Sequence, residues 1–180
     1  MSSHNDNTLL GQPEDCPVGY MQRLRDYYLA LGYDNPYRWA HYVDVPFCEL
    51  PKPVRESRVG LVTTAAPYKK GAGEQGAGAA YNAAAKFYRV YGSPSNHEQF
   101  LGISHLGYDR AHSTAEDRNS FFPLPALVNA AEQGLVGSLA PRYYGVPTNR
   151  SQVTTTQQDC ADVLALMQQD EVDLAILVPS

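Results

Sequence analysis

The stretch RVGLVTTA, residues 58–65, decides the fold class because it is the first segment with the composition of a buried strand. It is short and rich in β-branched residues, and polar or proline-containing sequence flanks it. A second strand is predicted at the other end of the chain, in VDLAILVPS (172–180). Apolar and polar residues do not alternate there, so we expect this strand to be buried on both faces, as central parallel strands are.

Helical patterns separate the predicted strands. The spacing of apolar residues predicts helices over 18–31, 123–134 and 154–170, the last with a threonine cap at its start. Further strands are predicted over 87–91 and 100–105, and strand or extended structure over 135–145. Strands that alternate with helices are typical of α/β folds. The sequence therefore predicts an α/β fold whose mainly parallel, Rossmann- or flavodoxin-like sheet has flanking helices.

The domain organisation follows from the polar and proline-rich segments. Residues 1–17 are polar and carry two prolines, so we expect a loose N-terminal arm. Residues 18–180 are expected to form a single α/β domain, because no second domain or internal repeat is visible. Within it, residues 32–57 are rich in proline and aromatic rings, and we expect them to wrap over the body because so many rings would not stay in water.

Composition and charge exclude several functional classes. The chain has a formal net charge of −5, so it lacks the basic surplus that grips nucleic acid. No uninterrupted apolar run approaches the ~20 residues of a membrane span, and the first residues lack the pattern of a secretion signal. Cys16, Cys48 and Cys160 are odd in number and far apart, so no disulfide framework is expected. These features predict a cytoplasmic protein with reduced thiols and neither nucleic acid nor membrane as a partner.

GAGEQGAG (71–78) has the G-x-G-x-x-G spacing of a dinucleotide-binding loop and lies between a predicted strand and an alanine-rich run. Two features speak against that function. Pro67 and two lysines separate the strand from the first glycine, and Glu98, the acidic residue at a suitable distance, falls in a predicted loop. We interpret residues 69–86 as a mobile insertion that could cover a site as a lid, with an NAD(P)-binding oxidoreductase as the alternative.

Polar residues concentrate in 102–124, after a predicted strand. His105 and Asp109 could orient each other as a general acid–base pair. The structural alternative is that Asp109 caps a turn, and that Asp117 with Asn119 caps the next helix. The spacing of the histidines matches no recognised metal motif, and no cation is arranged to activate a cysteine.

Three segments together resemble a known family. ISHLGYDRAHSTAEDRNSFFPLPALVNAAEQGLVGSLAPRYYG (103–145) resembles the core of the selenoprotein B family of glycine, sarcosine, betaine and D-proline reductases. The matching pattern is S-H-x-x-Y-D, then D-x-N-x-x-F-P, E-x-G and A-P-x-x-Y-G. VPFCELPKPVRESRVGLVTTAA (45–66) resembles the approach to the family's first strand, and DEVDLAILVPS (170–180) the strand that leads to its active site. The resemblance covers residues 18–180.

The resemblance implies a reductase that cleaves a C–N bond of a small amine or amino acid. The family's nucleophile is a selenocysteine or cysteine directly after the last strand, which places it just past Ser180. A pyruvoyl group on a partner reductase subunit would activate the amine, and this chain would carry no cofactor or metal itself. An in-frame UGA read as a stop, or a split gene, would explain why the chain ends at Ser180, before this nucleophile. The helix expected after the last strand would then be absent, and the apolar surface that it would cover would favour a homo-oligomer.

The resemblance also carries over residues of the site. His105, Asp109 and Tyr108 would be catalytic, the first two as a proton-handling pair, and five further residues would bind substrate. These five are Ser104, Asp117, Asn119, Arg142 and Tyr143. Arg142 or Tyr143 would meet a substrate carboxylate, which suits the bidentate geometry of arginine. The alternatives are that these residues only join loops at the edge of the sheet, or that the chain is a non-catalytic α/β binding or assembly subunit. The stretch APRYYG lacks a histidine that the family often has before the tyrosine, which leaves the substrate open.

Overall fold

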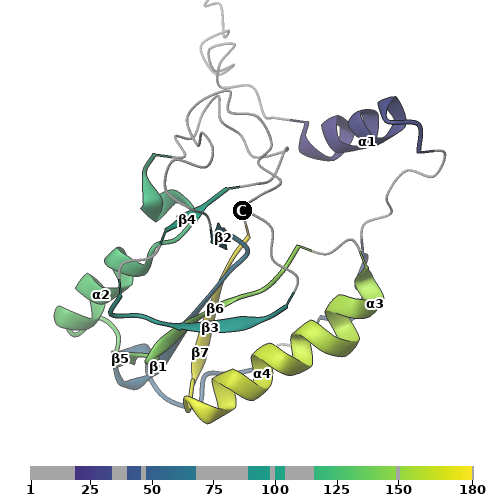
Figure 1. Cartoon of the computed structure of the whole chain (residues 1–180). Coiled ribbons are helices and arrows are strands. Elements are labelled where there is room, and N and C mark those ends of the chain that lie inside the picture. The colour runs from purple at the N-terminus through teal and green to yellow at the C-terminus, as the bar shows by residue number, and fades with distance from the viewer. Residues whose placement is uncertain are drawn as a thin grey trace, which may run out of the picture.

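The computed structural model describes residues 19–33, 40–45, 48–67, 89–97, 100–103, 116–148 and 151–179. Its helices are α1 (Tyr20–Ala30), η3 (Val54–Glu56), η5 (Arg118–Ser120), α2 (Leu124–Glu132), α3 (Gln152–Thr154), η6 (Thr155–Asp159) and α4 (Cys160–Gln169). Its strands are β1 (Arg58–Thr63), β2 (Ala66–Pro67), β3 (Tyr91–Pro94), β4 (Leu101–Gly102), β5 (Ser138–Leu139), β6 (Arg142–Gly145) and β7 (Leu174–Val178). Figure 1 shows their arrangement.

The main sheet is built around β1, the strand predicted from residues 58–65. On one side, β1 pairs in parallel with the whole length of β7. On the other side it pairs in parallel with β5 at its start and with β6 at its end. β3 pairs antiparallel with β6 at the margin of the sheet. The sheet is therefore mixed with mostly parallel strands, which confirms the α/β prediction at this level.

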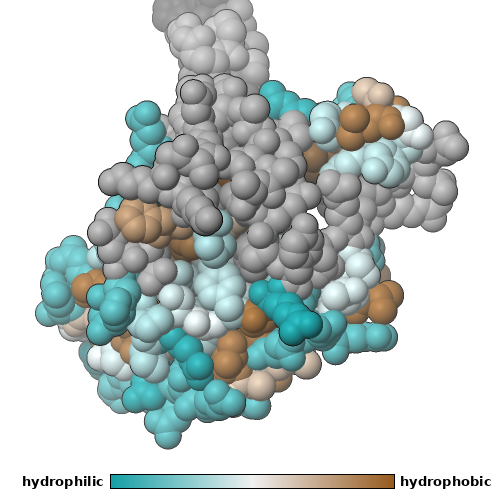
Figure 2. All heavy atoms as spheres, viewed as in Figure 1, coloured by the Kyte–Doolittle hydropathy of each residue, from teal (hydrophilic) through white to brown (hydrophobic). Residues whose placement is uncertain are grey.

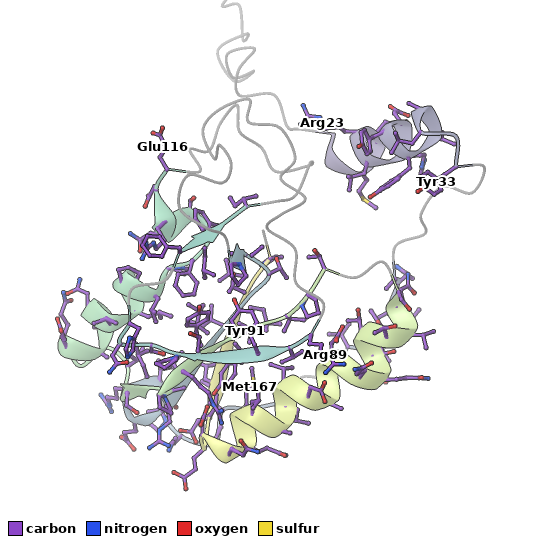
Figure 3. The ribbon with its side chains drawn as sticks, in the orientation of Figure 1. Arg23, Tyr33, Arg89, Tyr91, Glu116 and Met167 are labelled. Carbon is purple, nitrogen blue, oxygen red and sulfur yellow. The ribbon has the colours of Figure 1, made fainter. Side chains whose placement is uncertain are left out.

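Helices cover the two faces of this sheet in the manner of an α/β layer structure. Leu61 and Tyr143 belong to a buried cluster against which Leu127 of α2 packs. Their sequence neighbours Val62 and Tyr144 face the other way and belong to a second cluster, together with Val163, Leu166 and Met167 of α4. Figure 3 shows Met167 between α4 and the sheet. The alternation follows from the period of two in a strand, so consecutive residues serve opposite layers.

The long helix between β6 and β7 begins earlier than predicted. Ser151, rather than a threonine, is the cap, and its Oγ accepts a hydrogen bond of 3.2 Å from the backbone N–H of Thr154. A π-helical stretch over Thr155–Asp159 precedes α4. The helix returns the chain from the end of β6 to the start of β7, as a crossover between parallel strands requires.

The prediction that the last strand is buried on both faces was wrong. Within the described part of the chain, β7 pairs with β1 alone. Its burial alternates, and Leu177 is 70 % exposed. Ile176 and Val178 pack on the cluster with α2, whereas no residue of β7 belongs to the cluster under α4. An apolar run without alternation thus marks a strand here, but not its central position.

Three other predictions need correction. Residues 87–88 of the strand expected over 87–91 lie outside the described residues; residues 89–90 are not strand, and β3 starts at Tyr91, which pairs with Gly145 at the end of β6. Of the strand expected over 100–105, residues 100–103 are described, and β4 among them pairs antiparallel with β2 in a separate two-stranded sheet; residues 104–105 lie outside the described part of the chain. The aromatic segment 32–57 does not bury all its rings, since Tyr33 and Tyr42 are 54 % and 63 % exposed.

The helix predicted over 18–31 is present as α1. Leu24 is its buried apolar residue, while Met21, Leu29 and Leu31 are exposed. Figure 2 shows hydrophobic atoms gathered on this helix.

The arm over 1–17 and the glycine stretch 71–78 lie outside the described residues. In the part of the chain that is described, every helix is too short or too polar to cross a membrane.

Candidate functional site

The parallel strands give the sheet two distinct edges, and a polar cluster occupies the edge where the strands begin. Asp170 follows α4 and is 8 % exposed. Its Oδ2 accepts hydrogen bonds from Nε of Arg142 at 2.6 Å and from the hydroxyl of Tyr144 at 2.7 Å. Its backbone carbonyl accepts a bond of 2.8 Å from Arg58. The cluster therefore ties the end of α4 to the starts of β1 and β6.

The charges in this cluster stabilise one another. Burial alone would raise the pKa of Asp170, but hydrogen bonds from Arg142 and Tyr144 outweigh it and hold the pKa below its ordinary value. The hydrogen bond to Asp170 raises the pKa of Arg142, and burial raises that of Tyr144. The ionised carboxylate is therefore favoured, and its Oδ2 accepts two hydrogen bonds, which suits a structural role.

A second carboxylate fixes the same edge. Oδ2 of Asp173 accepts a bond of 2.7 Å from the backbone N–H of Arg58 and lies 2.7 Å from Nζ of Lys52. Its hydrogen bond with Lys52 lowers the pKa of Asp173. Catalytic crevices in open α/β sheets form at the opposite edge, beyond the carboxyl ends of the strands. We therefore assign the cluster around Asp170 and Asp173 to holding the fold.

The carboxyl ends of three strands meet at that opposite edge. The backbone N–H of Val146, which follows β6, donates to the carbonyl of Thr63 over 2.9 Å. The backbone N–H of Thr64 donates to the carbonyl of Val178 over 3.3 Å. The ends of β1, β6 and β7 are thus held together at one place, as Figure 1 shows for β1 and β7 beside the C-terminal mark.

The Thr63 hydroxyl joins a fourth segment to this edge. It accepts a bond of 3.0 Å from the backbone N–H of Ala65 and donates one of 3.4 Å to the carbonyl of Phe121. Phe121 follows η5, which contains the predicted residue Asn119 and has the predicted residue Asp117 as its N-cap. The segment 117–122 therefore lies against the carboxyl edge of the sheet.

Asp117 and Asn119 are exposed and directly linked. Oδ1 of Asp117 accepts a bond of 2.9 Å from the backbone N–H of Asn119. Asp117 therefore caps η5, and not the following helix α2 as the structural alternative supposed. This cap uses one carboxylate oxygen of Asp117 and leaves both side chains on the surface of the segment. Their role in binding substrate stays a prediction.

Arg142 and Tyr143 lie elsewhere. Arg142 begins β6 and is bound to Asp170 at the amino edge, with a further bond of 3.0 Å from its Nη2 to Gln169. Tyr143 is 1 % exposed, and its ring centroid is 4.7 Å from that of Phe122 and 6.1 Å from that of Tyr91. The structure thus separates Arg142 from Asp117 and Asn119, and it places Tyr143 in the core beneath their segment.

The remaining predicted residues, Ser104, His105, Tyr108 and Asp109, lie outside the described part of the chain, and so does Cys16. Cys48 and Cys160 are exposed free thiols. Within the described residues, no group of three or more histidine, cysteine, aspartate or glutamate side chains could hold a metal ion.

Sequence reasoning missed two residues of this edge, Thr63 and Arg118. Thr63 appeared only as part of a strand, yet its hydroxyl connects that strand with Phe121. Arg118 stands between the two residues of the D-x-N pattern, and that position could have drawn attention to it.

Comparison with known proteins found no matching family model, no matching curated protein and no matching solved structure.

Proposed function

We propose that this chain is a subunit of a reductase that cleaves the C–N bond of a small amine or amino acid, with its site at the carboxyl edge of the sheet. We further propose that the fold is of the Rossmann or flavodoxin type. The mostly parallel strands and the helices on both faces support that assignment. The antiparallel strand β3 is an addition at the margin.

One observation carries the proposal. The hydroxyl of Thr63 links the end of β1 to Phe121, and Thr64 bonds to the last residue of β7. Segments that are far apart in the sequence, and that each resemble the reductase family, therefore converge on one edge. This is the edge at which open α/β sheets bind ligands.

The position of β7 determines where the proposed nucleophile would lie. The resemblance places a selenocysteine or cysteine directly after this strand, so the nucleophile would stand at the edge that also carries Asp117 and Asn119. A selenolate is ionised at neutral pH and attacks carbon readily, as an activated thiolate does. The selenocysteine and the second cysteine of its motif would supply the two electrons that bond cleavage takes, and a thiol donor would reduce them again.

The partner and substrate follow from the same resemblance. A pyruvoyl group on a partner subunit would activate the amine, and the substrate would be glycine, a methylated glycine or D-proline. The described residues of this chain contribute a rigid sheet edge and the polar segment 117–122. Their role is to bind and orient the substrate beside the nucleophile.

The test reads the coding sequence beyond the codon of Ser180 and expresses the product with selenocysteine insertion. We expect a UGA or cysteine codon, then a cysteine codon three positions later. When the partner subunit is added, we expect thiol-dependent release of ammonia or a methylated amine from glycine or its methylated forms, or ring opening of D-proline. An ordinary stop codon with no adjacent reading frame that encodes the selenocysteine or cysteine motif would refute the catalytic proposal. Substrate binding without turnover would instead support the binding-subunit alternative.

A further inference from the structure

The two margins of the main sheet differ in composition. At one margin β3 has the sequence YGSP, in which glycine and proline disfavour pairing with a further strand. At the other margin β7 has the sequence LAILV, without a charged residue, a glycine or a proline. Within the described part of the chain, β7 pairs with β1 alone. The composition of β7 therefore lacks the residues that usually protect an edge strand from pairing with another chain.

The backbone of β7 alternates between β1 and the outer side of the sheet. The carbonyl of Val178 accepts a hydrogen bond of 3.3 Å from the N–H of Thr64, so Val178 directs its backbone groups toward β1. Ile176, two residues earlier, faces the same way because of the alternation within a strand. Ala175 and Leu177 therefore direct their N–H and C=O groups outward, where a further strand would pair.

The side chains of these two residues lie on the face that α4 covers. Leu177 pairs with Val62 in the register, and Val62 belongs to the cluster under α4. Residues that pair across two strands share a face of the sheet. Yet Leu177 is 70 % exposed and Ala175 is exposed as well. The cover by α4 therefore ends before the outer margin of β7.

Leu164 of α4 extends this apolar surface. Val163 and Met167 face the sheet, and the side chain of Gln169 accepts a hydrogen bond from Arg142 of β6 on one flank of the helix. Leu164 lies on the opposite flank, because five residues of helix separate its direction from that of Gln169 by about 140°. Since β6 and β7 lie on opposite sides of β1, Leu164 is on the side of β7, and it is 53 % exposed.

We propose that a second copy of this chain pairs antiparallel with β7, about a twofold axis at Ile176, and joins two main sheets into one. In this register Ala175 lies opposite Leu177 of the second copy. Both direct their backbone groups outward, so they exchange hydrogen bonds, and the small side chain leaves room for the large one. The strand carries no charge, and Asp173 lies opposite Pro179 of the second copy rather than opposite another carboxylate.

A twofold axis makes the assembly a closed dimer, because the same surface of each copy is used once. Leu164 and Leu177 of both copies then form an apolar strip on the α4 face. Antiparallel pairing also points the two carboxyl edges in opposite directions. Each copy therefore keeps its own site at the end of β1, and the dimer does not depend on the proposed function.

Sedimentation velocity over a concentration series tests this surface. We expect the wild-type chain to dimerise. Leu177→Lys should raise the dimer dissociation constant about 100-fold or more, since two buried charges would face the partner strand. Leu135→Lys is the matched control, because Leu135 is a 62 % exposed leucine before β5, on the other side of β1. It should leave the constant unchanged, and circular dichroism will show that both variants are folded.

Four outcomes would overturn the proposal. They are a wild-type monomer at every concentration, polymers larger than a dimer, equal dissociation constants of wild type and Leu177→Lys, and an equal effect of the control. A monomer that dimerises only after removal of residues 1–17 would assign this surface to that arm of the same chain, and not to a second copy.

A cysteine at the axis tests the register. In a chain whose three cysteines are replaced by serine, Ile176→Cys should form a disulfide between copies on oxidation. The expected pair is not hydrogen-bonded, and its Cα atoms would lie about 4.5 Å apart, within reach of a disulfide. Leu174→Cys should not cross-link, because the two equivalent residues would lie about 14 Å apart. No cross-link through Ile176→Cys, or one through Leu174→Cys, would overturn this register.

Discussion

Nε of Arg142 donates a hydrogen bond of 2.6 Å to Oδ2 of Asp170, and this contact joins the first residue of β6 to the residue that follows α4. The two residues are 28 positions apart in the sequence. The contact closes the crossover between two parallel strands at their amino ends. It explains why an arginine that sequence reasoning assigned to substrate is engaged in the framework of the fold.

The first prediction concerns this contact. Asp170→Asn keeps the size of the side chain but removes the charge that Arg142 and Tyr144 share. We expect the free energy of unfolding to fall by about 2 kcal/mol, because hydrogen bonds to charged groups are worth more than neutral ones. Chemical denaturation monitored by circular dichroism measures the loss.

Glu171→Gln is the control for that substitution. The side chain of Glu171 is 81 % exposed and its ion pair with Arg58 lies on the surface. We expect a change of less than about 1 kcal/mol, as for other surface pairs. Equal effects of the two substitutions would show that burial of Asp170 does not matter.

The second prediction is a dependence of stability on pH. The pKa of Asp170 is lower in the folded chain than its ordinary value of about 3.9. Its contribution to stability is therefore complete above that value, and it is lost as the pH falls through the lower pKa of the folded state. The difference in melting temperature between wild type and Asp170→Asn should be constant near neutral pH and should shrink in acid. A difference that grows in acid would have the wrong sign.

The third prediction concerns the packing of β3 on β6. A Cβ added at Gly145 would overlap the ring of Tyr91, which lies opposite it in the register. Gly145→Ala should lower the free energy of unfolding by about 1–3 kcal/mol, as overpacking does. In a Tyr91→Leu background the loss should be smaller, because the two sites are in contact. Strictly additive losses would mean that the ring does not fill this position.

The fourth prediction concerns the core beneath the segment 117–122. Phe122 is 0 % exposed and packs edge-on against Tyr143. Phe122→Ala should cost about 3–5 kcal/mol in the free energy of unfolding, whereas Phe122→Leu should cost less because it leaves a smaller cavity. Thermal unfolding of both variants gives the comparison. A loss below about 1 kcal/mol for Phe122→Ala would contradict the burial of this ring.

The sequence predicted the elements of the fold better than their arrangement. The β-branched run after Ser57 and the helical periodicity before Asp170 depend on local residues, and both elements are present. The position of β7 depends on which strand lies beside it, and a run of apolar residues carries no such information. The short strand β3 could not be placed either, because its pairing with β6 rather than its own composition sets its start.

The candidate site was predictable only in part for a similar reason. Asp117 and Asn119 were selected from the polar stretch 102–124 and again through the resemblance, and their segment lies at the carboxyl edge, while their role in binding stays a prediction. The resemblance also selected Arg142. However, β6 runs from Arg142 at the amino edge to Gly145 at the carboxyl edge, so Arg142 lies at the wrong end of the strand for the proposed site. Arg118 lies inside the same motif but was not predicted. The sequence does not show where this segment lies, because its position depends on the packing of Phe122 against Tyr143.

The most direct test of the proposed site is nuclear magnetic resonance of the ¹⁵N-labelled chain during titration with glycine and D-proline. We predict that the amide signals of residues 63–65, 117–122 and 145–146 shift together, since these residues form the carboxyl edge. The signals of Arg58 and of residues 170–173 at the amino edge should stay in place. Shifts confined to the amino edge, or no shifts at all, would contradict the account.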